Sequence, residues 1–172
     1  LVAEAAPDAR PADPAEPTEA PPAAKPGNVH PGASFCDLTY DDFVQSAAVV
    51  APVLATAREF GVGPAVLAAM RATRLVCDSN PNLGIVLLLA PLAAVPADVS
   101  LREGIADVLE ALTVNDAAKV YEAIRIAQPG GLGSVDDQDV SSEPDVTLLE
   151  AMRLAADRDL VAAQYADRFS IV

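Results

Sequence analysis

Several common fold and function classes depend on residues that this sequence has in short supply. Aromatic residues make up 4% of the 172 residues, and tryptophan is absent. Sheets draw on aromatic and β-branched side chains, whereas Ala, Leu and Val dominate this chain, which favours packed helices. Two cysteines and one histidine are too few for a four-ligand zinc site. A disulfide framework would normally need more cysteines in a smaller chain.

Basic residues and long apolar runs are also scarce. The chain has 11 Lys and Arg against 25 Asp and Glu, and nucleic-acid affinity comes mainly from basic side chains, so we expect no nucleic-acid partner. The most apolar run, "LGIVLLLAPLAAV" at 83–95, is shorter than the ~20 residues of a membrane span and contains Pro91. No signal peptide is recognisable. We therefore expect a cytoplasmic protein without a membrane partner.

The composition changes along the chain. Residues 1–24 are rich in Pro and Ala and lack apolar periodicity, which predicts a disordered tail. Residues 25–172 predict one all-α domain, a single bundle of about six to seven helices. The chain starts without Met and stops at "FSIV", so we expect a domain truncated at its C-terminal end.

Capping residues mark the expected helix starts. Thr39 forms a capping box with Asp42 and begins a helix that Pro52 kinks and Gly61 ends. The apolar helix from Leu83 is expected to be central, because it is hydrophobic all round. Further helices are expected from Gly63-Pro64, Ser100, Asn115 and Asp145, and over "LVAAQYADRF".

Three polar segments interrupt the helices, and loops on a rigid body commonly carry binding residues. In "KPGNVH", Lys25 offers a charge for phosphate, Gly27 and Asn28 offer donors, and His30 can transfer a proton near neutral pH. The alternative is a simple turn that joins the tail to a helix.

The second segment, "CDSNPNLG", stands directly before the buried helix. Asn80 and Asn82 would bring the free N–H groups of its first turn toward an anion, and Arg71 and Arg74 on the preceding helix could support it. The alternative is an ordinary Asn cap followed by solvated arginines.

The third segment, "PGGLGSVDDQD", follows a helix. Gly131 lets the backbone approach a ligand, and Asp136 and Asp139 could hold Mg²⁺. The alternative is a helix C-cap with an acidic surface loop. The sequence has neither a dinucleotide-binding fingerprint nor a phosphate-binding P-loop, and a lone His30 without a nucleophile elbow gives no catalytic triad.

In order, "KPGNVHPGASFCDLTYDDFVQSA", "NPNLGIVLLLAPLA", "VYEAIRIAQPGGLGSVDDQDV" and "TLLEAMRLAADRDLVAAQYAD" resemble the triphosphoribosyl-dephospho-CoA synthase family, over about residues 25–168. The resemblance implies an all-helical transferase. It would join ATP to 3'-dephospho-CoA, form the 2'-(5''-triphosphoribosyl) derivative and release adenine.

Site roles follow from this resemblance. Lys25, Gly27, Asn28, Gly131 and the helix start after Asn80 and Asn82 would bind the nucleotide. Asp136 or Asp139 would hold Mg²⁺, one of these carboxylates would act as general base, and His30 would protonate the departing adenine. The implied partners are phosphorylated small molecules, and a homo-oligomer is compatible with the sequence.

One motif departs from the pattern of the decarboxylase-associated members. They read Asn-Thr-His-Lys-Gly where this chain reads "NPNLG", so Asn82 and Leu83 replace His and Lys. The sequence is closer to a branch that reads Asn-Thr-Asn-Leu-Gly and is associated with one-carbon cofactor pathways. A diverged nucleotide-using enzyme of such a pathway and a non-catalytic helical ligand-binding module are therefore the alternative functions.

Overall fold

The protein is described here by a computed structural model that covers residues 29–30, 32–35, 38–128 and 140–170. Within these residues it contains eight α-helices and no β-strand, which confirms the predicted all-α bundle. The predicted tail, residues 1–24, lies outside this part. The helices are α1 (Tyr40–Leu54), α2 (Ala57–Phe60), α3 (Val62–Val76), α4 (Leu83–Ala94), α5 (Leu101–Glu110), α6 (Val114–Ala127), α7 (Leu148–Ala155) and α8 (Leu160–Ala166).

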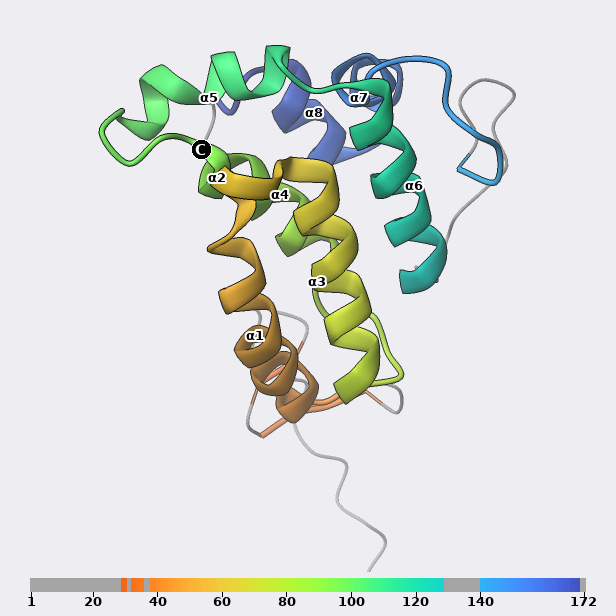
Figure 1. The fold of residues 1–172 in the computed structure, drawn as a ribbon. Coiled ribbons are helices and arrows are strands. Elements are labelled where there is room, and N and C mark those ends of the chain that lie inside the picture. Colours follow the sequence, from red (N-terminus) through yellow and green to blue (C-terminus); the bar gives the residue numbers. More distant parts are fainter. Residues whose placement is uncertain (1–28, 31, 36–37, 129–139, 171–172) are drawn as a thin grey trace, which may run out of the picture.

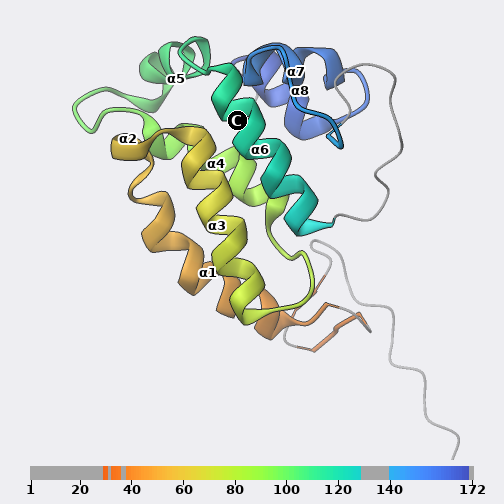
Figure 2. The ribbon, with the colours of Figure 1, turned by 45° about the vertical axis from the view of Figure 1, so that its right-hand side comes forward.

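Helix α3 occupies the middle of the bundle. It lies between α1 and α6 and also packs on α4, while α5, α7 and α8 gather at one end (Figure 1). The same arrangement is visible after rotation (Figure 2). One continuous hydrophobic core joins these helices, and its fully buried members include Val66, Met70, Val86, Leu109 and Val120. Helix α4, predicted to be central, packs on α1, α2, α3, α5 and α8. It is not buried on every side, because Ile85 and Leu89 are 48% and 44% exposed.

Capping boxes begin α1, α6 and α7, and a serine cap begins α5. Thr39 and Asp42 form the predicted box of α1, and Ser100 accepts from the Glu103 N–H at the start of α5. Two predicted starts were wrong. The N-cap of α6 is Thr113 rather than Asn115, and that of α7 is Thr147 rather than Asp145.

Both corrected caps have the same cause. Each threonine has an acidic residue three positions later, Asp116 and Glu150 respectively, and the two side chains exchange hydrogen bonds with each other's backbone N–H. Asn115 and Asp145 have no such partner at that spacing. The capping box therefore sets the start of both helices.

The expected continuous helix from Thr39 to Gly61 is divided in two. Helix α1 ends at Leu54, and the hydroxyl and N–H of Thr56 both donate to the Val53 carbonyl, at 2.7 and 3.0 Å. This turn separates the short α2 from α1 and accounts for the eighth helix. Gly61, at φ 89°, then ends α2 in a conformation that favours glycine.

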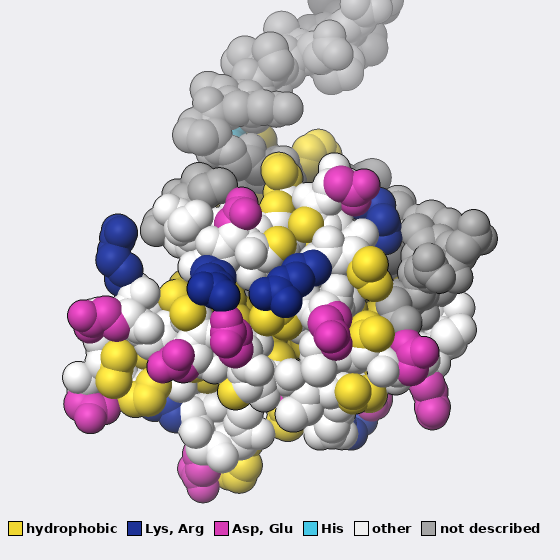
Figure 3. Space-filling view, turned by 90° about the horizontal axis from the view of Figure 1, so that it is seen from above, with side chains coloured by type: hydrophobic (Ala, Val, Ile, Leu, Met, Phe, Trp, Pro, Cys, Tyr) yellow, Lys and Arg dark blue, Asp and Glu magenta, His cyan; other side chains and the backbone are white. Residues whose placement is uncertain are grey.

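The end of the bundle formed by α5, α7 and α8 has a mixed surface. Acidic and apolar side chains lie among its basic ones in Figure 3. Among the residues that the structure describes, no helix is long and apolar enough to cross a bilayer. Helix α4 in particular has only 12 residues.

Candidate functional site

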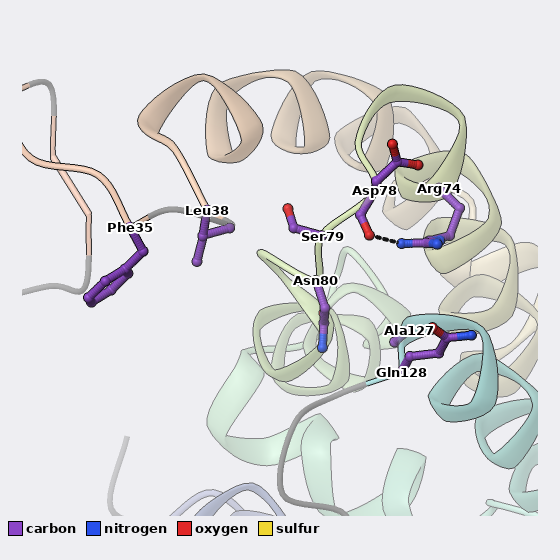
Figure 4. Close-up of a pocket in the computed structure, with 8 residues that line it drawn as sticks. All are labelled: Phe35, Leu38, Arg74, Asp78, Ser79, Asn80, Ala127 and Gln128. Carbon is purple, nitrogen blue, oxygen red and sulfur yellow. Dashed lines mark hydrogen bonds between the residues drawn. The ribbon is translucent and has the colours of Figure 1, made fainter.

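An open cleft of about 570 Å³ lies where three parts of the chain meet. Figure 4 shows Phe35 and Leu38 on one side, Ser79 and Asn80 in the middle, and Arg74, Ala127 and Gln128 on the other side. Asp78 completes the lining. These residues belong to the chain before α1, to the end of α3 with the α3–α4 connection, and to the end of α6. The second stretch includes residues of "CDSNPNLG", the third directly precedes "PGGLGSVDDQD", and the first follows "KPGNVH" by five to eight residues.

Local hydrogen bonds shape the chain before α1. His30 and Ala33 exchange two main-chain bonds of 3.0 and 2.9 Å, and the Phe35 N–H donates to the Leu38 carbonyl at 2.9 Å. The capping box at Thr39 then begins α1 immediately after Leu38. Phe35 remains 55% exposed, and Figure 4 shows its ring at the outer edge of the cleft, pointing away from Asn80.

Asn80 and Asn82 have different surroundings in the α3–α4 connection. The Asn80 side-chain oxygen accepts from the N–H of Leu83, the first residue of α4, at 3.1 Å, and the residue also lines the cleft. The N-cap position itself is Asn82, whose side chain makes no capping bond. Asn82 is only 6% exposed, and its side chain pairs with the Thr73 hydroxyl on α3. It is not among the cleft-lining residues. Asn80 therefore lines the proposed anion site, whereas Asn82 is buried beneath it and joins the α3–α4 connection to α3 through Thr73.

The other predicted site residues divide into two groups. His30 is exposed, its Nδ1 accepts from the Gly32 N–H at 3.1 Å, and it is not among the residues that line the cleft. The remaining ones lie outside the described residues, and their proposed roles stay predictions; they are Lys25, Gly27, Asn28, Gly131, Asp136 and Asp139.

Of the eight described wall residues, only Arg74 and Asn80 were singled out from the sequence. Phe35 and Leu38 are apolar, and Gln128 ends α6 in a left-handed conformation with φ 47°. The signal for Phe35 was an aromatic residue, in a chain with few of them, placed between a Pro-Gly turn and a helix cap. Nothing in the sequence around Gln128 indicated that its side chain lines a cleft.

Charge in the cleft is unevenly placed. Arg74 is the one cation among the described wall residues, and its guanidinium donates to the main-chain carbonyl of Asp78. The Asp78 carboxylate is turned away from that guanidinium in Figure 4. Close by, Cys77 is buried, and this burial raises the pKa of its thiol, with the Asp42 carboxylate adding to the effect. Cys77 therefore stays a neutral thiol near pH 7.

Comparison with known proteins identifies the family. The sequence model of the ATP:dephospho-CoA triphosphoribosyl transferase family matches residues 14–172. The chain belongs to this family. The resemblance inferred from the sequence motifs is thereby confirmed.

A solved structure agrees with the assignment. A protein of Archaeoglobus fulgidus provisionally named triphosphoribosyl-dephospho-CoA synthase superposes with a TM-score of 0.56 at 25% identity. The match covers 75% of this chain and 58% of that protein, so this chain spans less than two thirds of the length of its relative. A search of curated proteins finds no match.

Proposed function

We propose that the protein is an ATP-using triphosphoribosyl transferase whose substrates meet in the cleft between the chain before α1, the α3–α4 connection and the end of α6. The observation that carries the proposal is the meeting of these three stretches in one cleft, since they include, directly precede or closely follow the segments selected for phosphate, metal or proton chemistry. The family assignment and the solved relative support the reaction class.

The reaction would break the N-glycosidic bond of ATP and leave the triphosphate intact. The 2'-hydroxyl oxygen of 3'-dephospho-CoA would attack C1' of the ATP ribose, and adenine would leave with the electron pair of the C1'–N9 bond. The hydroxyl proton passes to a base, and adenine takes up a proton. Because no phosphoanhydride is cleaved, the protein mainly has to position both substrates and hold the phosphates.

The proposed roles follow the sequence analysis. Lys25, Gly27, Asn28 and Gly131 would bind the nucleotide, together with the helix start after Asn80 and Asn82. Asp136 or Asp139 would hold Mg²⁺ and supply the base, and His30 would protonate adenine. Both aspartates lie outside the described residues, and their role as metal ligands is our proposal from the sequence.

The test is direct. The protein is incubated with ATP, Mg²⁺ and 3'-dephospho-CoA, free adenine is measured by chromatography, and the coenzyme product is measured by mass spectrometry. We expect adenine and product in equal amounts, with adenine release dependent on the acceptor. If ATP binds and neither forms, the proposal for this acceptor is wrong.

A second candidate is a diverged transferase that uses another acceptor, such as an intermediate of one-carbon cofactor biosynthesis. It is favoured by the burial of two positions. Asn82 and Leu83 stand where the decarboxylase-associated pattern has His and Lys, and here they are 6% and 8% exposed. Neither is among the cleft-lining residues. ATP-dependent adenine release with a pterin-type acceptor, but not with dephospho-CoA, would support this candidate. Nucleotide binding without turnover of any acceptor would support a non-catalytic binding module.

A further inference from the structure

Two arginines of α3 are three residues apart and have different partners. Arg71 forms an ion pair with Glu122 of α6, at 2.5 Å between Nη2 and Oε1. Arg74 lines the cleft, and its described contact is with the main-chain carbonyl of Asp78, a neutral acceptor. Within the described residues no carboxylate lies at ion-pair distance from Arg74. The charge of Arg71 is therefore compensated by Glu122, whereas the charge of Arg74 is available to a ligand in the cleft.

The contact with Asp78 also fixes where that charge stands. A guanidinium has five N–H donors in a planar arrangement, and the Asp78 carbonyl occupies part of this set at the C-terminal end of α3. The remaining donors can reach an anion bidentately, as arginine does with phosphate. The chain has a net charge of −14, and the Arg74 guanidinium has no ion-pair partner among the described residues. It can therefore attract an anionic group to this part of the cleft.

The opposite side of the cleft has a different chemistry. Phe35 is 55% exposed, and Leu38 beside it is half-buried. Figure 4 places both on the side away from Arg74. An exposed aromatic ring at the edge of a cleft is suited to stacking on a flat heterocycle, and such stacking contributes about 1–3 kcal/mol per base in nucleic-acid complexes. Between the two sides, Asn80 and Gln128 provide amide groups.

We infer that a nucleoside triphosphate lies along this cleft with its phosphates at Arg74 and its base at Phe35. This orientation rests on the proposed function, because it takes ATP as the ligand. It places the ribose and its glycosidic bond between the two sides, near Asn80. Arg74 is then the phosphate-binding residue of the described wall, and Phe35 holds the base that becomes the leaving group.

Calorimetric titration of the whole chain with two probes tests this orientation. The probes are ATP with Mg²⁺ and inorganic triphosphate with Mg²⁺. Arg74→Ala should weaken both by about tenfold or more, because a charge-assisted contact to phosphate is lost. Phe35→Ala should weaken ATP by about fivefold or more and leave triphosphate within about twofold. Thermal unfolding of each variant verifies that it is folded.

Arg71 was considered from the sequence as support for an anion together with Arg74, but it does not line the cleft and is paired with Glu122. Arg71→Ala is therefore the matched control, since it removes the same charge from the same helix outside the cleft. We expect it to leave both affinities within about twofold of the original. Equal weakening by Arg71→Ala and Arg74→Ala would overturn the inference, because long-range charge alone would then explain the effect. Weaker triphosphate binding in Phe35→Ala than in Arg74→Ala would overturn the orientation.

The same experiments separate this inference from the proposed function. A protein that binds both probes as described and releases no adenine would contradict the transferase and leave the orientation standing. A protein that releases adenine, and whose Arg74→Ala variant retains the original affinity and KM for ATP, would contradict the orientation and leave the transferase standing. A protein that binds neither probe would overturn both.

Discussion

The Tyr165 hydroxyl donates a hydrogen bond of 2.6 Å to the main-chain carbonyl of Leu87. In an α-helix this carbonyl would accept from the N–H four residues later, but that residue is Pro91, which has none. Tyr165 is fully buried, and burial raises the pKa of its phenol, so the group stays a donor. Helix α8 thus supplies the donor that the sequence of α4 lacks, and this bond holds α8 on the apolar helix.

Removing this hydroxyl should destabilise the fold. In Tyr165→Phe the Leu87 carbonyl is left buried without a donor, and we expect the free energy of unfolding to fall by about 1–3 kcal/mol. Urea denaturation measures the change. Tyr40→Phe is the control, because Tyr40 is exposed, and it should stay within about 0.5 kcal/mol of the original.

A double substitution isolates the cause. Pro91→Ala restores the N–H at position 91, so Tyr165→Phe should cost clearly less in that background than in the original chain. An equal cost in both backgrounds would mean that the tyrosine stabilises the core through packing and not through the Leu87 carbonyl.

Gly63 and Asp116 define how closely α3 and α6 approach. Asp116 Oδ1 accepts from the Gly63 N–H at 2.9 Å, and Oδ2 accepts from the Thr113 N–H at 2.9 Å. A Cβ atom at position 63 would lie 2.6 Å from the Asp116 Cα atom. Gly63→Ala must push the two helices apart, so we expect a loss of about 1–3 kcal/mol in the free energy of unfolding.

Gly84→Ala provides the matched control for this substitution. A Cβ there would first meet Val161 at 3.7 Å, an ordinary contact, inside helix α4. We therefore expect Gly84→Ala to be neutral or to stabilise by up to about 1 kcal/mol, as alanine does in helices. If both substitutions cost the same in urea denaturation, the close approach of α3 and α6 is not what selects glycine at position 63.

Local signals predicted the helices well because caps act over three residues. The box at Thr39 was found from spacing alone and is confirmed. At Ser100 the predicted helix start is confirmed, and the serine accepts from the Glu103 N–H without the reciprocal bond of a full box. At α7 the prediction chose Asp145 and missed Thr147, although Glu150 stands at the required spacing from Thr147. The Tyr165–Leu87 bond joins residues 78 positions apart. No local pattern contains such a pairing, because it depends on how α8 packs against α4.

Part of the candidate site was predictable, because residues at the start of a helix can be recognised from local sequence. Asn80 was selected as a residue at the start of a helix, and it does accept from the first N–H of α4 and line the cleft. Asn82 was selected with it, yet its side chain is turned inward to Thr73. The direction of a side chain in this six-residue connection, residues 77–82, is decided by the neighbouring helix, and sequence spacing does not contain that information. Arg71 and Arg74 likewise look equivalent in the sequence. Only their partners in the structure, Glu122 and the Asp78 carbonyl, show which of them faces the cleft.

Glu150, at the start of α7, should make the stability of the protein depend on pH. The main-chain N–H of Thr147, and next its hydroxyl, donate to the Glu150 carboxylate and lower its pKa below the ordinary value of 4.5. The ionised form is thus favoured in the folded state, so its contribution to stability is complete above the unfolded pKa and is lost as pH falls through the folded one.

The hydroxyl part of this effect can be removed separately. Thr147→Val retains the main-chain donor and loses the hydroxyl, so the pKa of Glu150 should move back toward its ordinary value. Thr147→Ser, which retains both donors, should leave that pKa unchanged. A carboxyl-carbon NMR titration of Glu150 measures it. An unchanged pKa in the valine variant would show that the main-chain donor acts alone.

Asn80 allows the structural and binding roles of one side chain to be separated. Asn80→Ala removes the acceptor for the Leu83 N–H and should lower the free energy of unfolding by about 0.5–2 kcal/mol. Asn80→Asp retains an acceptor in the same place and adds a negative charge, which is favourable near a helix N-terminus. We therefore expect the aspartate variant to be at least as stable as the original protein in urea denaturation.

The added charge should have the opposite effect on the ligand. Asn80 lines the cleft together with Arg74, so a carboxylate there would repel the phosphates of a nucleotide and partly neutralise the arginine. Asn80→Asp should therefore bind ATP clearly more weakly than the original protein while remaining as stable, which calorimetry and denaturation measure on the same sample. If that variant binds ATP as tightly as the original protein, the nucleotide does not lie near Asn80, and the role of this residue is limited to the start of α4.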